Sequence, residues 1–210
     1  LVLSKSLFAF SSHESIYWGS FLTGAVTESQ IEIPDVSCLA ITDAGILAGQ
    51  RDGTLVCIDD ADTEPRVIHH TPAAIDAIAA DPRQHTIIML TDEQIWLRKR
   101  SGWQAIEAAP TATTCALSPT NTQFAVGYED GTIRIWQMAT LEASEPIRLG
   151  TARVDRIAFS GDDYLVAGLC GGTIFLEAPM TETRIFELAD LTAEVHDLMF
   201  SNSGNLMAIE

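Results

Sequence analysis

The sequence predicts an all-β fold, and three observations predict it. Short apolar runs recur along the whole chain, separated by turn residues, in units of about 40 residues. Alanine recurs at one equivalent position of the first run, and Asp-Gly pairs stand between the second and third runs. No stretch keeps the 3.6-residue period of an amphipathic helix. Units of this length, each with four short strands, predict a β-propeller of four-stranded blades.

Two columns of equivalent residues define the first strand of each unit. A polar residue ends the strand, at Ser11, Thr42, Asp81, Ser118, Ser160 and Ser201. Two positions earlier stand Ala9, Ala40, Ala79, Ala116, Ala158 and, in the last unit, Met199. The alanines predict a strand that is crowded on one face. The continuous apolar runs of the inner strands predict burial on both faces.

The first two units begin the series. The first unit, residues 4–33, contains the runs LFAFS and IYWGSF, and we expect the preceding Leu1-Val2-Leu3 to form an outer strand. The second unit, residues 34–71, has four runs: CLAIT, ILAGQ, TLVCID and RVIHH. Its Asp52-Gly53-Thr54 segment predicts a tight hairpin, because glycine readily supplies the positive φ that such a turn needs.

The third and fourth units repeat this arrangement. Residues 72–110 contain AIAAD, TIIML, QIWLR and WQAIEA. Residues 111–150 contain CALSP, FAVGY, TIRIWQ and PIRLG, with Asp130-Gly131-Thr132 at the hairpin. Each unit therefore predicts one four-stranded blade.

The last units predict a fifth full blade and a partial sixth. Residues 151–190 contain RIAFS, YLVAG, TIFLEA and RIFEL, and residues 191–210 contain only DLMFS and LMAI. We interpret residues 1–210 as a single propeller domain of about five full blades plus a partial sixth. Since the sequence lacks an initial methionine and stops within the sixth unit, we expect a longer chain, or a strand or blade donated by a partner, to complete the propeller.

The repeats resemble those of the WD-repeat family. The fourth unit, ALSPTNTQFAVGYEDGTIRIWQ, is similar to the family pattern: a strand ending in Ser-Pro, a Gly-x-x-Asp-Gly-Thr hairpin, and a third strand ending in Trp136. Trp96 is the candidate for the same position in the third unit. The family's Gly-His dipeptide is absent from every unit. We therefore expect apolar packing, rather than the family's hydrogen-bond network, to hold these degenerate repeats together.

Composition excludes two classes of partner. The net charge is −17, from 29 acidic and 12 basic residues, so the chain repels a phosphate backbone and no direct nucleic-acid binding is expected. The basic cluster Arg98-Lys99-Arg100 is interpreted as a solvated turn. No apolar run approaches the roughly 20 residues of a membrane-spanning helix.

Cysteine usage favours a reducing compartment, cytoplasm or nucleus. Cys38, Cys57, Cys115 and Cys170 form no CxxC pair, which predicts buried reduced thiols and no metal site. The acidic run 59–64 lacks the central glycine and the distant glutamate of a calcium loop. His69-His70 has no further ligand at metal-binding spacing. No cofactor is expected.

The sequence contains no G-x-S-x-G elbow, no Walker loop, no H-E-x-x-H motif and no G-x-G-x-x-G after a strand. We therefore expect a protein that is not an enzyme. The leading hypothesis is a protein-interaction scaffold or adaptor within a multiprotein complex. The alternatives are a recognition domain attached to an effector outside this sequence, and an enzyme or small-ligand binder that uses the central channel. His196 and Asp155 are the ionisable candidates for that channel.

The resemblance also implies where partners bind. In the WD-repeat family, partners often contact the face that carries the start of the first strand and the hairpin between the second and third strands. Aromatic residues and arginine commonly anchor interfaces. The candidate partner-binding residues are Trp18, Arg51, Tyr128, Glu129, Asp155, Arg156 and His196.

Overall fold

The structure is a computed structural model, and it describes residues 2–3, 7–12, 14–20, 27–59, 64–106, 111–163, 166–178, 187–188, 195, 197–201 and 205–209. All regular structure in these residues is β. The chain forms two compact units, residues 1–110 and 111–210, which are considered separately.

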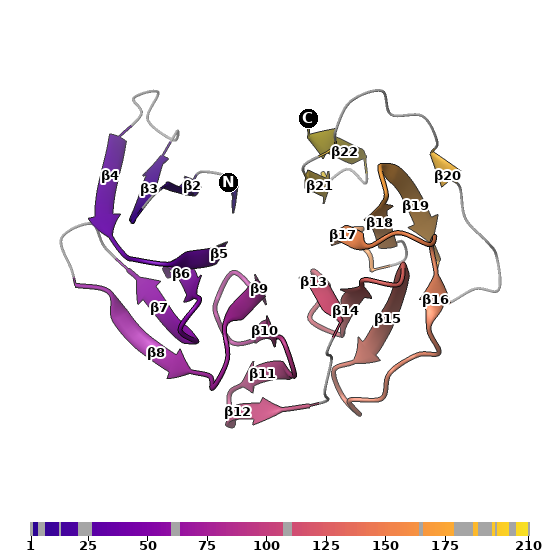
Figure 1. Ribbon diagram of the computed structural model, residues 1–210, viewed down its shortest axis with the longest axis horizontal. Helices are drawn as coiled ribbons and strands as arrows, with labels where there is room; N and C mark the ends of the chain where they lie inside the picture. Colours follow the sequence, from indigo (N-terminus) through magenta and orange to yellow (C-terminus); the bar gives the residue numbers. More distant parts are fainter. Residues whose placement is uncertain are drawn as a thin grey trace. The chain divides into compact units, whose positions relative to one another are not determined.

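The described part of the first unit contains three four-stranded antiparallel sheets (Figure 1). They are formed by β1 (Val2–Leu3), β2 (Leu7–Ser12), β3 (Ser15–Ser20) and β4 (Thr27–Glu32); by β5 (Val36–Thr42), β6 (Gly45–Gln50), β7 (Thr54–Ile58) and β8 (Arg66–His70); and by β9 (Ile75–Ala80), β10 (Ile87–Thr91), β11 (Ile95–Lys99) and β12 (Gly102–Ala105). Strand β1 pairs with the first strand β2, Val2 opposite Ala9, so this run is not the predicted outer strand.

The second unit continues the series with two four-stranded sheets and one two-stranded sheet among its described residues. They are formed by β13 (Ala112–Leu117), β14 (Gln123–Tyr128), β15 (Thr132–Gln137) and β16 (Ile147–Arg148); by β17 (Val154–Phe159), β18 (Val166–Cys170), β19 (Thr173–Glu177) and β20 (Glu187–Leu188); and by β21 (Asp197–Phe200) and β22 (Leu206–Ile209). The predicted fold class, five four-stranded sheets and a partial sixth, is confirmed.

Burial is deepest in the second strand of each sheet, not in the first. Strands β6, β10, β14 and β18 are buried at almost every position, whereas β5, β9 and β13 are mostly half-buried. Each second strand has a paired neighbour on both edges, while β5, β9 and β13 pair along one edge only. The prediction of two-sided burial therefore holds for the second strands and is wrong for these first strands.

Recurring glycines allow neighbouring sheets to approach each other closely. A Cβ on Gly49 would lie 2.8 Å from Ile75 Cγ2 of the next first strand, and one on Gly127 would lie 2.7 Å from Val154 Cγ1. Both distances are shorter than real carbon–carbon contacts. Ile75 and Val154 are fully buried, so glycine leaves the space that their side chains fill.

The polar residue that ends each first strand closes the turn to the second. Thr86 N donates to Asp81 Oδ1 at 3.2 Å, and Gln123 N donates to Ser118 Oγ at 3.1 Å. Both acceptor residues are buried. In these two sheets, the side-chain acceptor satisfies a buried backbone N–H, which explains the polar residue at this position.

The Asp-Gly-Thr hairpins have the chemistry that the sequence predicted. Asp52 Oδ1 accepts from Thr54 N at 2.8 Å, and Asp130 Oδ1 accepts from Thr132 N at 3.0 Å. The hydrogen bond from Thr54 N lowers the pKa of Asp52, and the hydrogen bonds from the Thr132 hydroxyl and, secondarily, Thr132 N lower the pKa of Asp130. Gly53 between Asp52 and Thr54 has φ of 87°, a conformation that glycine adopts without strain.

The two tryptophans of the third strands occupy different positions. Trp136 is buried opposite Phe124 and stacks on its ring with centroids 5.1 Å apart. In the third sheet, the residue opposite Ile87, which corresponds to Phe124, is Arg98. Trp96 instead pairs with Met89, which lies two positions after Ile87 in β10. The prediction that Trp96 takes the position of Trp136 in the third unit is therefore wrong.

Candidate functional site

The predicted binding elements lie at the same end of their sheets. In the second sheet, Arg51 N in the β6–β7 hairpin donates to Asp35 O, just before β5, at 2.9 Å. In the fourth sheet, Glu129 N donates to Thr111 O at 2.9 Å in the equivalent way. These hydrogen bonds fix each hairpin beside the start of its own first strand.

In the first unit, this end carries a small charged cluster around Asp76. Burial and the carboxylate of Asp92 raise the pKa of Asp76, while the positive charge of Arg51 lowers it. Arg51 and Asp92 are exposed and belong to the β6–β7 and β10–β11 hairpins of neighbouring sheets. The sequence predicted Arg51 as a binding residue but did not connect it with the aspartates.

In the second unit, the equivalent end carries two exposed ion pairs. Arg153 Nε lies 3.3 Å from Asp155 Oδ1, and Arg156 Nε lies 3.5 Å from Asp197 Oδ1. Arg156 also donates to the carbonyl oxygen of Asp155 at 2.7 Å. The four charged side chains are between 38% and 59% exposed, so this part of the surface is charged, accessible and held at the starts of two adjacent first strands.

The other predicted residues of the second unit flank the same end of the fourth sheet. Tyr128 is half-buried at the end of β14, and Glu129 is exposed in the hairpin that follows. The structure thus brings Asp155 and Arg156 together at the start of β17. Arg51 belongs to the other unit.

Two further residues predicted to bind partners are Trp18 and His196. Trp18 is half-buried on β3, opposite Ala9, and packs against the apolar cluster between the first and second sheets that includes Ile16, Ile46 and Val56. Its side chain therefore contributes to packing between sheets. His196 lies outside the described residues.

A bulge at the start of four first strands was not anticipated from the sequence. The pairing register shifts around Ser37, Asp76, Thr113 and Asp155. In the fourth sheet, Thr113 Oγ1 donates to Gly127 O of its own sheet at 3.1 Å and to Val154 O of the next at 2.5 Å. Ser37 makes the same two contacts, with Gly49 and Ile75. The polar residue at the second position of these four first strands is the sequence signal for this bulge.

The cysteines are free thiols. Burial raises the pKa of Cys38 to about 12, and burial also raises the pKa values of Cys57 and Cys170. Protonated thiols of this kind are poor nucleophiles. In the part of the chain that the structure describes, no group of three or more His, Cys, Asp and Glu side chains could hold a metal ion.

No helix in the described ranges has the length and apolar character needed to cross a membrane.

Comparison with known proteins gives matches at two levels. Residues 107–137 match the family model "WD domain, G-beta repeat". Transducin beta-like protein 3 of Bos taurus is 32% identical over 114 residues, which cover 50% of this chain and 13% of that protein. The chain thus spans a small part of this relative's length.

Two solved structures share the fold. A chain in the crystal structure of the mitotic checkpoint complex superposes with a TM-score of 0.81 at 16% identity, covering 96% of this chain and 68% of its own. A protein of unknown function from Desulfotomaculum acetoxidans superposes with a TM-score of 0.76 at 17% identity, covering 98% and 73%. Together with the repeated four-stranded sheets, these two structures show that the chain has a β-propeller fold, and residues 107–137 match one WD repeat.

Proposed function

We propose that this chain is a non-catalytic protein-interaction scaffold or adaptor within a multiprotein complex. Proteins with this fold and these repeats are typically interaction scaffolds. The similar chain in the mitotic checkpoint complex belongs to an assembly of this kind, which supports the proposal. The four free thiols support a reducing compartment, cytoplasm or nucleus, as the place of action.

The observation that carries the proposal is the charged surface at the start of β17 and β21. Its two ion pairs are exposed, and exposed pairs contribute only about 0–1 kcal/mol to stability. Arg153, Asp155, Arg156 and Asp197 can therefore exchange their present partners for those of another protein at little cost. These residues lie in or beside strands β17 and β21, so binding would order their side chains without ordering a long loop.

Three residues extend this surface or repeat its position in the other unit. Tyr128 and Glu129 stand at the hairpin of the neighbouring fourth sheet, and Arg51 stands at the equivalent hairpin of the second sheet. Tyrosine and arginine are enriched among residues that dominate binding energy. We therefore propose Arg51, Tyr128 and Arg156 as the main partner contacts.

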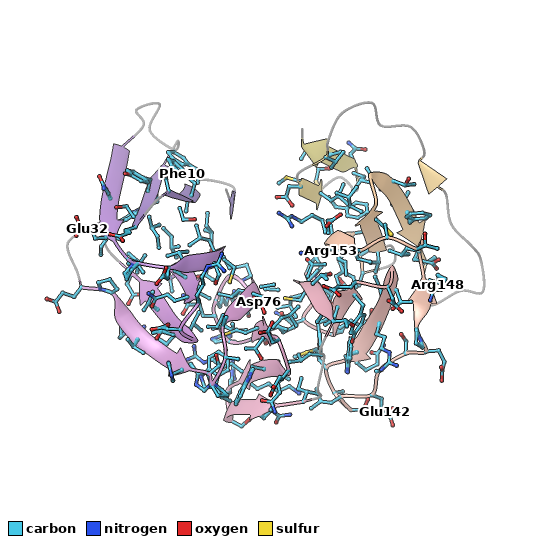
Figure 2. All side chains as sticks on the ribbon, viewed as in Figure 1. Phe10, Glu32, Asp76, Glu142, Arg148 and Arg153 are labelled. Carbon is cyan, nitrogen blue, oxygen red and sulfur yellow. The ribbon has the colours of Figure 1, made fainter. Side chains whose placement is uncertain are left out.

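The test is affinity purification from the native source with quantitative mass spectrometry. The triple variant Arg51→Ala, Tyr128→Ala, Arg156→Ala should lose the specific partners by at least about tenfold while melting like the wild type. A matched variant, Arg83→Ala, Gln137→Ala, Glu142→Ala, changes exposed residues at the opposite ends of the strands and should retain them. In Figure 2, Glu142 lies well apart from Arg153 within the second unit. Undiminished recovery with the first variant would disprove these contacts.

A further inference from the structure

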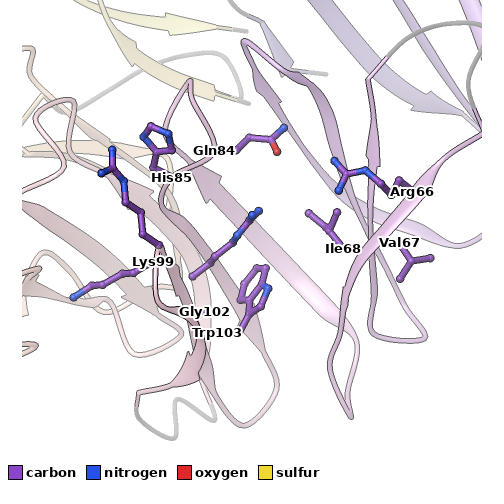
Figure 3. Close-up of a pocket in the computed structure, with 10 residues that line it drawn as sticks. Arg66, Val67, Ile68, Gln84, His85, Lys99, Gly102 and Trp103 are labelled. Atoms are coloured by element: carbon purple, nitrogen blue, oxygen red, sulfur yellow. The ribbon is translucent and has the colours of Figure 1, made fainter.

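A pocket in the first unit concentrates the positive charge of a strongly acidic chain. It has a volume of about 440 Å³ and lies between strand β8 of the second sheet and the β9–β10 turn and β11–β12 hairpin of the third (Figure 3). Four of the chain's 12 Lys and Arg residues line it: Arg66, Arg98, Lys99 and Arg100. His85 adds an imidazole ring, and none of the ten lining residues is acidic.

The packing of the two sheets orients Arg98. Arg98 is opposite Trp103 in the β11–β12 pairing, and its guanidinium carbon lies 5.9 Å from the centre of the Trp103 ring. Trp103 in turn stacks on His69 of β8, with ring centroids 4.2 Å apart and planes within 13°. A guanidinium held over an aromatic face stays charged and is weakly hydrated, which suits it to bind an oxyanion.

A bulge in β8 shapes the opposite wall. The pairing register of β7 and β8 shifts between Leu55 and Val56, and Ile68 falls outside the pairing. As a result, adjacent residues Ile68 and His69 both take part in packing between the sheets: Ile68 packs against the apolar cluster that includes Ile87 and Met89, and His69 stacks on Trp103. Figure 3 shows Arg66 and Gln84 extending toward each other across the pocket.

The positive charges of Arg66, Arg98 and Arg100 are only weakly neutralised within the described residues. Arg66 Nη2 lies 3.4 Å from Asp59 Oδ2, but the two side chains are 62% and 47% exposed, so solvent weakens this ion pair. Within the described residues, no carboxylate lies within ion-pair distance of Arg98 or Arg100. A concave surface lined by one sign of charge attracts ligands of the opposite sign.

The pocket combines this charge with apolar surface. Trp103 and Ile68 are half-buried in its wall, and Val67 is 62% exposed beside it. The volume lies within the range of about 300–1,000 Å³ that is usual for ligand sites. Strand β8 is also the edge of its sheet, where an extended backbone could add hydrogen bonds. A single inorganic anion would use only part of these features.

We propose that this pocket binds an acidic peptide segment of a partner protein. Arg66 and Arg98 hold its carboxylates, and an apolar side chain of the peptide rests on Trp103 and Ile68. A nucleic acid fits less well, because the basic residues gather in one pocket and do not continue along a groove within an acidic chain. This site is separate from the strand-end surfaces of the proposed function, and its test has its own readout.

The probe is a fluorescent peptide with one leucine flanked by glutamates, titrated by fluorescence polarisation against the full chain. We expect saturable binding that weakens with added salt. The variant Arg66→Gln, Arg98→Gln should weaken binding about tenfold or more, because charge-assisted hydrogen bonds are lost. The control Arg134→Gln, Arg148→Gln removes the same charge from the fourth sheet and should change the affinity less than about twofold. Replacing the peptide's leucine by alanine should weaken binding to the wild type.

Three outcomes would overturn the proposal. The first is no binding of the acidic peptide to the wild type. The second is equal loss of affinity in the pocket variant and its control, which would show only long-range attraction. The third is tighter binding of inorganic phosphate or of an RNA oligonucleotide to the same arginines, which would assign the pocket to another class of ligand. Circular dichroism melts of each variant separate loss of binding from loss of fold.

Discussion

At the scale of single residues, the junction between sheets depends on the absence of a side chain. Gly49 and Gly127 face Ile75 and Val154 of the next sheet at distances that leave no room for a Cβ. These glycines belong to the second-strand runs ILAGQ and FAVGY. The sequence did not show why glycine stands there, because the facing residue comes 26 or 27 positions later and only the packing of two sheets brings it close.

Gly127→Ala should therefore destabilise the fold by about 1–3 kcal/mol, because overpacking a filled core forces neighbouring atoms to move. Urea denaturation followed by circular dichroism measures this loss. Gly161→Ala is the matched control, since a Cβ there has no atom within 4 Å and its φ is not positive. Equal stability of the two variants would show that the contact between Gly127 and Val154 can accommodate a Cβ.

The ring of His69 gives a pH-dependent prediction. Burial, and to a smaller degree the charge of His70, lowers the pKa of His69, so its neutral form is favoured in the fold. The unfolded chain takes up this proton near the ordinary pKa of about 6.5. The free energy of unfolding should therefore be highest above that value and should fall as the pH drops through the lowered folded pKa.

His69→Phe keeps a flat ring against Trp103 but cannot be protonated, so its stability should fall less than that of the wild type between about pH 7.5 and 5. His69 Nε2 is buried without a hydrogen-bond partner in the described structure, so this substitution leaves no new unsatisfied group. Urea midpoints at the two pH values provide the measurement. Parallel pH profiles for wild type and variant would rule out His69 as the source.

At the scale of the strand, the bulge at the start of the first strands links neighbouring sheets through one hydroxyl. Thr113 and Ser37 each donate toward a carbonyl of their own sheet and toward one of the next first strand. Asp76 and Asp155 occupy the same position in the third and fifth sheets and carry charge to the candidate surface. The same bulge thus supports packing between sheets in the second and fourth sheets, and it places a charged side chain at the candidate surface in the third and fifth.

Thr113→Val keeps the shape of the side chain but removes the hydroxyl, and should lower the free energy of unfolding by about 1–2 kcal/mol. Hydrogen exchange should show reduced protection in β13 and β17. Thr113→Ser retains the donor and should remain close to the wild type. If valine and serine behave alike, the hydroxyl is not what links these strands.

At the scale of the whole molecule, the repeats made the fold predictable from the sequence. Because the repeats are degenerate, they did not predict the strand register or the position of the basic pocket. The alanine column, the polar column and the Asp-Gly-Thr segments were enough to predict five four-stranded sheets and a partial sixth. They did not predict the register that puts Arg98 opposite Ile87, or the pairing of β1 with β2, because both depend on how strands align in space. The basic pocket was missed because Arg66 and Arg98 come from different repeats, and Arg98-Lys99-Arg100 alone resembled a solvated turn.

The glycine junction also bears on how such a chain changes over generations. Gly49 with Ile75 and Gly127 with Val154 form the same interlocking pair, a missing side chain on one sheet and a branched one on the next. The first pair joins the second and third units, and the second pair joins the fourth and fifth. Deleting the third and fourth units together would set Gly49 against Val154, a pair of the same kind, so this joint would need no compensating mutation. Deleting the third unit alone would set Gly49 against Ala112, which stands at the position of Ile75 in the fourth unit.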